Sequence, residues 1–478
     1  MAAQSGVDRA ESYILAGERE QAVALLEPAI EKMDEAKVPD WMKARAHGSR
    51  LASDGMVSNA LHDGGPPSVI AETSCCGFPC LPVATLRYQG PPAGGPVTTI
   101  VRPIELPRDA GRFLRSWWPI YEGDEHWVPP VIFERKRFLD PRVNPYFKHA
   151  TIQCFMAYQD GRPVGTIAAT VDHRQVEHQP GLGNIGFFEF IEDEEVAGEL
   201  LEAACDFLRE QGMTRVQGPF NFNSNHEFGL LIDGFDTDPM IANPHNREYY
   251  GRIYEAIGMQ KSMDWFAYWF DNVGDRPERM VRINDGILRR YPGIRLRKVD
   301  MSKLDEEAEL LWEIYNDAWS ENWGHVHFNR DEFEFTVQGL KQVLNPDLCF
   351  FVYYEDELAG VSVTLPDFNQ VAKKMNGSIF PFGWWHFLTG RRKIDALRVF
   401  VLGIKTKFQH LPLGSPLYMA TWAEGRKLQP PVRGAEASLV LEDNHRMRGP
   451  IEKMGAKIYK TYRIYDKALI EGEELGEE

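Results

Sequence analysis

The stretch that decides the fold reads Ala-Leu-Arg-Val-Phe-Val-Leu-Gly-Ile from Ala396 to Ile404 and then, after four further residues, Gln-His-Leu-Pro-Leu-Gly from Gln409 to Gly414. The apolar run predicts a strand, and the polar turn leads into a helix that opens with Ser415. At such a junction the free backbone N–H groups and the positive end of the helix dipole point at the turn. The sequence therefore predicts an anion site at residues 409–414 that can hold a pyrophosphate without a specialised side chain.

Downstream of this turn the sequence predicts a second strand at 436–444, a short helix that ends at Gly455, and a third strand around Tyr462 and Tyr465, which closes the unit. This order of elements resembles the GNAT (N-acetyltransferase) superfamily, which holds acyl-coenzyme A in a turn after its fourth strand. In that family a tyrosine four residues before the helix-ending glycine often protonates the leaving thiolate. Ile451 stands at that position here, so the usual acid is missing.

The turn itself matches the family pattern Gln/Arg-x-x-Gly-x-Gly/Ala in part. Gln409 and Gly414 fit, whereas Pro412 replaces the middle glycine and has no N–H to donate. The resemblance implies that acetyl-coenzyme A or another acyl-coenzyme A is the co-substrate. The residues expected to bind it are Val401, Leu402, Gln409, His410, Leu411, Leu413, Gly414 and Asn444.

An internal repeat indicates a duplicated domain. Residues 154–175 align without a gap on residues 349–370, and each copy predicts a hairpin of two apolar strands around a polar turn. The identical pairs are Cys154/Cys349, Phe155/Phe350, Tyr158/Tyr353, Gly165/Gly360, Asp172/Asp367 and Gln175/Gln370. The period is far longer than that of a solenoid, so a whole domain is repeated.

The predicted fold class is therefore α/β with a mixed sheet, as two GNAT-like acyl-CoA N-acyltransferase domains in tandem. The expected ranges are a helical N-terminal extension at 1–46, a disordered Gly/Pro-rich linker at 47–96, an N-terminal domain at 97–272, a linker at 273–294, a C-terminal domain at 295–470 and an acidic tail at 471–478.

The two copies differ where a cofactor would bind. In the first copy the fourth strand, at 185–190, runs directly into Glu192-Asp193-Glu194-Glu195 and a helix, without a glycine turn. Acidic residues at a helix start suit the helix dipole but repel a pyrophosphate, so we expect this copy to have lost coenzyme A binding. Tyr254, four residues before Gly258, is either a surviving general acid or a buried helix residue. His226 and Glu227 are a further acid/base candidate, although neighbours on a strand would face opposite sides.

In the second copy, Glu436 and Glu442 are candidate general bases on one face of a strand, or else solvent-facing residues of it. The acceptor is expected to contact Trp319, Asn322 and Trp323, which lie where acyltransferases of this shape place their acceptor loop. The two tryptophans, spaced at i and i+4, would share a helix face, which is equally consistent with packing.

Composition limits the classes of partner. The net charge of −17 argues against non-specific nucleic-acid binding, which needs a basic surface. No apolar run approaches the ~20 residues that span a bilayer, and the N-terminus lacks a signal-peptide pattern, so we expect a cytoplasmic protein without a membrane partner. The six cysteines predict no disulfide framework, and Cys75-Cys76-x-x-x-Cys80 has no second ligand pair, so no metal site is expected.

The function predicted is N-acyl transfer, foremost N-acetyl transfer, from acyl-coenzyme A to a small-molecule amine or a peptide. One alternative is a non-catalytic acyl-coenzyme A-binding or scaffolding protein, favoured by Pro412 and Ile451. The other is an aminoacyl-tRNA-dependent transferase of similar architecture, which would need a basic groove. The oligomeric state stays open.

Overall fold

The computed structural model describes residues 98–271, 278–379, 383–470 and 472. The predicted N-terminal helical extension, the linker at 47–96 and the acidic tail, apart from Gly472, lie outside the described residues.

The first half of the described chain follows the predicted order of hairpin, strand, helix and strand. Its strands are β1 (Ile100–Ile104), β2 (Ala150–Gln159), β3 (Arg162–Asp172), β4 (Leu182–Phe190), β5 (Arg215–Gly218), β6 (Leu230–Asp233) and β7 (Gln260–Asp271). Its α-helices are α4 (Ala110–Arg115), α5 (Trp117–Ile120), α6 (Ile132–Phe138), α7 (His173–His178), α8 (Glu194–Glu210) and α9 (Tyr249–Ala256).

The second half repeats this order. Its strands are β8 (Ile294–Lys298), β9 (Cys349–Tyr354), β10 (Glu357–Pro366), β11 (Ala396–Ile404), β12 (Gly434–Leu441) and β13 (Lys457–Ala468). Its α-helices are α10 (Glu278–Arg290), α11 (Leu304–Ala318), α12 (Arg330–Leu340), α13 (Asn369–Met375), α14 (Gly383–Gly390), α15 (Gly414–Gly425) and α16 (His445–Lys453). Helix α10 lies in the range predicted as a linker.

The repeated hairpins form because of their turn residues. Between β2 and β3 the two loop residues are Asp160 and Gly161, and between β9 and β10 they are Glu355 and Asp356, all with positive φ. Two successive residues in this conformation match the right-handed twist of the strands that they join. The predicted hairpins are thus confirmed in both halves.

One continuous sheet runs through both halves, in the order β1-β2-β3-β4-β5-β13-β7-β12-β11-β10-β9-β8. Strand β13 pairs with β5 and β7 of the first half, and β7 pairs with β12 of the second half. The prediction that the strand around Tyr465 closes its own unit is therefore wrong. Each half contributes its last strand to the other, so neither half has a free edge at the junction.

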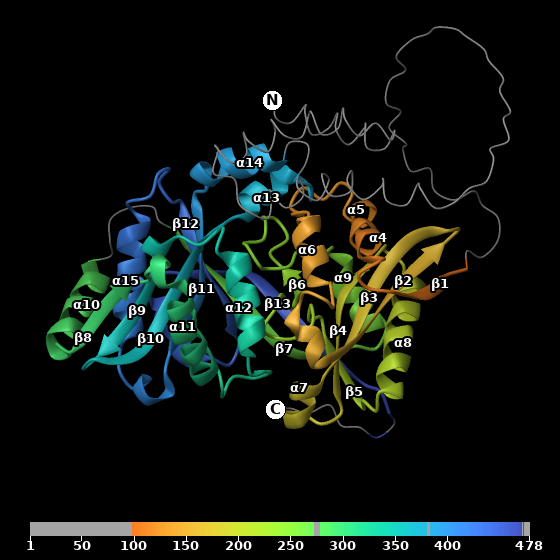
Figure 1. The fold of residues 1–478 in the computed structure, drawn as a ribbon, viewed down its shortest axis with the longest axis horizontal. Coiled ribbons are helices and arrows are strands. Elements are labelled where there is room, and N and C mark those ends of the chain that lie inside the picture. The colour runs from red at the N-terminus through yellow and green to blue at the C-terminus, as the bar shows by residue number, and fades with distance from the viewer. Residues whose placement is uncertain (1–97, 272–277, 380–382, 471, 473–478) are drawn as a thin grey trace, which may run out of the picture. The chain divides into compact units, whose positions relative to one another are not determined.

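Helices cover the sheet on both sides of this junction (Figure 1). Helix α8 packs its apolar stripe of Leu200, Leu201, Ala204 and Leu208 on β2 and β3. In the second half α15 packs on β9 and β10 and carries α10 on its outer side. The described residues from Thr99 onward form a single compact unit.

Candidate active site

Strands β11 and β12 diverge and open the site. They pair in parallel from Ala396 with Gly434 to Val399 with Ala437, and no pairing follows although both strands continue. The register of β11 on β10 shifts so that Phe400 is an extra residue. Because a bulged residue leaves the ladder, its backbone groups are free to face the opening.

Strand β12 bends at the same level. Its register on β7 shifts between Ala437 and Val440. The intervening Ser438 and Leu439 line a cavity at the opening between β11 and β12. This irregularity also interrupts the alternation of side chains along β12. Strand β12 also ends at Leu441, before Glu442, so Glu436 and Glu442 do not share a strand face as predicted.

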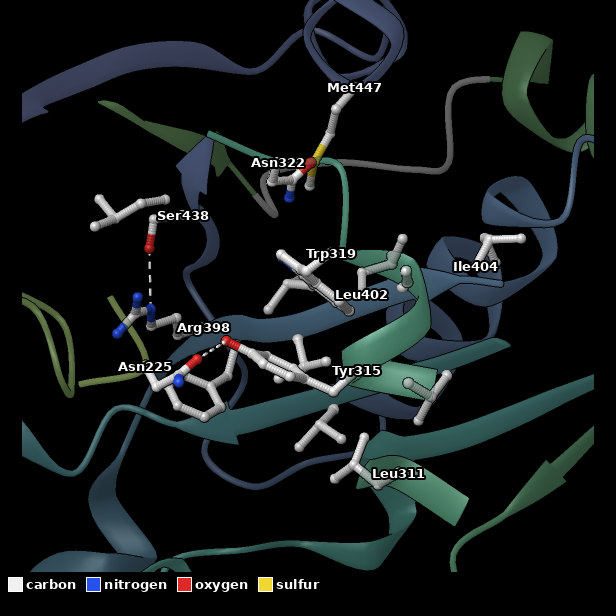
Figure 2. Close-up of a pocket in the computed structure, with 18 of the residues that line it drawn as sticks. Asn225, Leu311, Tyr315, Trp319, Asn322, Arg398, Leu402, Ile404, Ser438 and Met447 are labelled. Atoms are coloured by element: carbon white, nitrogen blue, oxygen red, sulfur yellow. Dashed lines mark hydrogen bonds between the residues drawn. The ribbon is translucent and has the colours of Figure 1, made fainter. Parts of the chain in front are cut away.

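A cavity of about 1220 Å³ begins at this opening. Residues of the second half line one side of it, and residues of α6 and of the 224–227 loop of the first half line the other. Figure 2 shows Asn225 of this loop opposite residues of the second half. Apolar side chains dominate the wall and include Phe138, Trp265, Leu311, Trp319, Trp323, Phe328, Phe333, Leu340, Phe351, Val361, Val401, Leu402 and Met447. The cavity exceeds the roughly 300–1,000 Å³ typical of pockets for small ligands.

The predicted anion turn borders this cavity. Helix α15 begins at Gly414, and its N-cap residue Leu413 offers no side-chain acceptor to the first N–H groups. Gln409, Gly414 and Ser415 line the cavity, and so does Pro412. A helix N-terminus that no side chain caps is suited to an anionic ligand such as a pyrophosphate.

The remaining predicted cofactor residues divide into two groups. Val401, Leu402 and Asn444 line the cavity, and the side chain of Asn444 also caps α16 by accepting from the N–H of Met447 (3.1 Å). Leu413 is fully buried in a cluster with Leu417, while Leu411 packs against that cluster and His410 is exposed. The side chains of these last three do not line the cavity.

The predicted acceptor residues all line the cavity, although by a different geometry from the one expected. Helix α11 ends at Ala318, so Trp319 and Trp323 lie in the following turn and share no helix face. Trp319 stacks on Tyr315 at 4.8 Å between ring centroids, and Trp323 lies edge-on to Trp265 of the first half. Asn322 lies between them in sequence and also lines the cavity.

Gly403 on β11 makes room for the Trp319 ring. A Cβ atom at this position would lie 2.3 Å from the ring, so a larger residue would displace it. Trp319 therefore packs directly against the open strand of the site.

The 224–227 loop of the first half forms the polar wall of the cavity. The hydroxyl of Tyr315 donates to Asn225 (3.0 Å), the amide of Asn225 donates to the carbonyl of Val326 (2.9 Å), and Ser224 donates to the carbonyl of Gly324 (2.7 Å). Figure 2 shows the contact between Tyr315 and Asn225. The first half is thus bonded to the predicted acceptor loop.

His226 and Glu227 both line the cavity. They belong to a turn and not to a strand, so the objection that neighbours face opposite sides does not apply. Burial lowers the pKa of His226 to about 3, and its Nδ1 has no partner among the described residues. The Glu227 carboxylate accepts from Arg135 and from Asn221 (2.8 Å).

Glu436 is fully buried and does not line the cavity. Its carboxylate accepts from Asn243 (2.8 Å), Ser438 and Tyr459, and it lies 3.4 Å from the guanidinium of Arg398. A carboxylate with these partners balances the buried arginine. Glu436 therefore supports the site by balancing the charge of Arg398.

Arg398 and Ser438 connect this buried pair to the cavity, which both of them line. The guanidinium of Arg398 donates to Ser438 (2.9 Å), as Figure 2 shows, and to the carbonyl of Ile241. Burial lowers the pKa of Arg398, while the charge of Glu436 acts against this shift. Neither residue was among the predicted site residues, because their proximity depends on how β11 lies beside β12.

Glu442 and Tyr254 lie elsewhere. Glu442 bonds to Lys261 (2.9 Å) and to the N–H of Asp264 (3.1 Å), outside the cavity wall. Tyr254 is fully buried against Phe188 and Tyr465, and burial raises the pKa of its hydroxyl well above 10. The geometry thus places Tyr254 in the core of the first half.

The three cysteines that the structure describes, Cys154, Cys205 and Cys349, are buried free thiols. Within the described residues no helix has the length and apolar content to cross a membrane.

The duplicated mixed sheet, with a diverging parallel strand pair in each half and a helix after the open strand, defines a tandem protein of the GNAT fold.

No family model matches the chain. The chain is 38% identical over 379 residues to the bacterial ceramide synthase of Caulobacter vibrioides (strain NA1000 / CB15N), an alignment that covers 77% of this chain and 97% of the relative. It is 31% identical over 393 residues to Protein YghO of Escherichia coli (strain K12), an alignment that covers 80% of this chain and 97% of that relative. The chain belongs to the family of these two proteins.

Solved structures similar to this one include a tandem GNAT protein from the clavulanic acid biosynthesis pathway, with a TM-score of 0.49 and 14% identity, covering 79% of this chain and 100% of that one. A GCN5-related N-acetyltransferase from Sphaerobacter thermophilus has a TM-score of 0.43 and 13% identity, and the match covers 79% of this chain and 98% of that one.

Proposed function

We propose that this protein is an acyl-coenzyme A-dependent N-acyltransferase that joins a long-chain acyl group to the amine of a long-chain amino alcohol, which makes a ceramide-like amide. The observation that carries the proposal is the single cavity that connects the uncapped N-terminus of α15, the open strands β11 and β12, and the polar 224–227 loop. One end suits an anionic carrier, the middle suits a thioester, and the far wall suits a polar acceptor headgroup.

Two observations favour long chains over the acetyl group that the sequence first suggested. The cavity holds about 1220 Å³ and is lined mainly by apolar and aromatic side chains, which favours hydrocarbon by the hydrophobic effect. A relative with 38% identity carries the name bacterial ceramide synthase, and a ceramide is an amide of two long-chain partners.

The proposed reaction needs few groups from the protein. The amine nitrogen attacks the thioester carbonyl, the carbon–sulfur bond breaks so that the thiolate of coenzyme A leaves with the bonding electron pair, and the amine proton passes to a base. Residues Gln409, Gly414 and Ser415 would hold the carrier, and the bulge at Phe400 would offer a backbone N–H to the developing oxyanion. Alignment of the two reactants within one cavity supplies much of the acceleration.

We assign the general base to Glu227. Its carboxylate lines the cavity, and Arg135 and Asn221 hold it in place. Next to it, the neutral ring of His226 packs among the rings of Phe138, Tyr146 and Phe222, and its buried Nδ1 has no partner among the described residues. Glu436 is a weaker candidate because its carboxylate is already enclosed by four partners.

A second candidate function is acyl-coenzyme A binding without turnover. Ile451, at the position of the usual acid, is fully buried in an apolar cluster, and Pro412 removes one backbone donor from the turn.

The test is to incubate the purified protein with acyl-coenzyme A of different chain lengths and with sphinganine or a short amine, and to measure thiol release together with amide product. We expect product with the long-chain pair and a loss of about a hundredfold or more in kcat for Glu227→Gln. Glu442→Gln, a matched change outside the cavity, should leave kcat unchanged. Ligand-dependent stabilisation without product would favour the binding function, and an unchanged kcat in Glu227→Gln would remove that residue from the mechanism.

A further inference from the structure

The segment 278–298, which comprises α10 and β8, has an unusual charge for this chain. It contains seven arginine and lysine residues against two acidic residues, in a protein whose net charge is −17. Such a reversal of sign marks a surface that attracts an anionic partner.

The four arginines of α10 lack ion-pair partners in the described part of the chain, although one of them, Arg290, lies over the Tyr291 ring, 5.8 Å from its centroid. They are Arg279, Arg282, Arg289 and Arg290. By contrast, the basic residues of β8 are occupied: Arg295 pairs with Asp356, Arg297 with Glu307 (2.7 Å), and Lys298 with Asp347 (2.8 Å). The free positive charge of the segment is therefore concentrated on α10.

Exposed apolar side chains gather on the same segment. Ile283 is 49% exposed, Leu288 39% and Leu296 38%, and these are three of the eight large apolar residues that are exposed within the described chain. Helix α10 has no fully buried residue. Arginines interleaved with protruding apolar side chains are typical of helices that lie in the interface of a bilayer.

The position of α10 connects this surface to the cavity. The helix packs on α15 beside the edge strand β8, at the rim of the sheet (Figure 1). Arg279, Met280 and Ile283 line the cavity. A separate groove of about 760 Å³ beside α10 is lined by Arg282, Arg426 and Lys427, together with Trp422 and Glu278, and Lys427 also pairs with Glu424 (2.7 Å).

We propose that α10, together with β8, docks the protein onto an anionic lipid bilayer, with the mouth of the cavity turned toward the lipid. Such docking needs no helix that spans the membrane, because interfacial helices bind by charge and by a few inserted apolar side chains. The docking itself stands on the charge and exposure of α10. Only the reason for it, delivery of long-chain substrates, rests on the proposed function.

The test measures binding to vesicles without any substrate. The intact protein is mixed with vesicles of phosphatidylcholine alone or of phosphatidylcholine with phosphatidylglycerol, and the bound fraction is determined by flotation. We expect binding to the anionic vesicles only, weakened by added salt, and reduced at least about tenfold in Arg282→Glu/Arg289→Glu, since each basic residue near such a surface contributes about 1 kcal/mol. Leu288→Asp should weaken binding further.

The matched control is Arg391→Glu/Arg392→Glu, which makes the same change of charge on the exposed turn after α14. Near that turn, Trp385 is 54% exposed and provides a rival contact. Equal loss in the control, equal binding to neutral vesicles, or binding to a short RNA in place of vesicles would overturn the proposal. Activity on detergent-dispersed substrate should survive in Arg282→Glu/Arg289→Glu, so failure of docking and failure of the proposed reaction are distinguishable.

Discussion

The two halves share one topology and differ in what fills the gap between their parallel strands. In the first half β4 and β5 separate after the pair Asn184 and Gln217. The next residues of the chain then close the gap: the N–H of Phe220 donates to the carbonyl of Ile185 (2.7 Å), and Asn221 accepts from the N–H of Phe187 (2.8 Å). The first half therefore bonds its own backbone where a ligand would bind.

In the second half the corresponding gap stays open. Strands β11 and β12 separate after Val399 and Ala437, and the cavity occupies the space between them. The contrast is also visible at Gly186 of the first half, where an added Cβ would lie 1.8 Å from the carbonyl oxygen of Phe220. Diverging strands thus permit a binding site, and the segment that follows them decides whether one exists.

The N-termini of the helices that follow these strands, α8 and α15, also differ between the halves. The side chain of Asp193 caps α8 by accepting from the N–H groups of Glu195 (2.9 Å) and Val196 (3.3 Å). Helix α15 begins after Leu413, which has no acceptor to offer. One helix end is thus neutralised by the protein itself, and the other remains available to an anion.

The largest effect is expected from Gly414→Glu. A carboxylate at the N-terminus of α15 would repel the pyrophosphate, so the stabilisation of about 2.7 kcal/mol that acyl-coenzyme A gives at 100 times its Kd should disappear from a thermal-shift titration.

Gly414→Ala is the control for shape, because an added Cβ there would lie 3.9 Å from its nearest neighbour, in Tyr418. This variant should keep the shift, as should Glu195→Ala at the helix start of the first half. A thermal shift that persists in Gly414→Glu would show that the N-terminus of α15 does not bind the pyrophosphate.

An intermediate effect concerns His149, which joins the halves. It lies 3.2 Å from Asp172 of the first half and also bonds to Glu332 of α12. Burial lowers the pKa of His149, but the bonds to Asp172 and Glu332 outweigh burial and raise the pKa to about 9.

Because this pKa is raised from about 6.5, the stabilisation is fully present below pH 6.5 and is lost as the pH rises through 9. The protonated ring owes this stabilisation to its two carboxylate partners, Asp172 and Glu332. Denaturant unfolding should show this fall in wild-type protein and a flatter profile in His149→Gln. If the two profiles coincide, the contact does not hold the halves together.

The smallest effect is expected from Asp193→Ala in the first half. Loss of the cap on α8 should lower the free energy of unfolding by about 1 kcal/mol, measured by denaturant titration. The affinity for acyl-coenzyme A should not change. A change in affinity would mean that the first half still takes part in binding the carrier.

Local patterns in the sequence predicted the repeated part of the molecule well. The hairpins at 150–172 and 349–366 followed from alternating apolar residues around two turn residues, and the start of α15 followed from the polar turn before Gly414. These features depend on contacts between residues that are close in the chain. The predicted residues Val401, Leu402, Gln409 and Gly414 accordingly meet in one cavity.

The same patterns could not predict which partners distant segments would find. Glu436 looked like an exposed base on a strand, but its burial with Arg398 depends on β11 lying beside β12. Tyr254 occupied the position of an acid, but neighbouring aromatic rings enclose it. Burial is a property of the assembled core, which the spacing of residues along the chain does not contain.

The sequence by itself determined that the chain is doubled and that only the later copy has a helix start fit for an anion, because periodicity, turn residues and caps act over a few residues. The tertiary structure alone decided that β7 and β13 change places between the halves and that the loop with His226 and Glu227 forms the opposite wall of the second copy's cavity. Those arrangements come from strand edges and apolar faces that find their partners across nearly the whole chain.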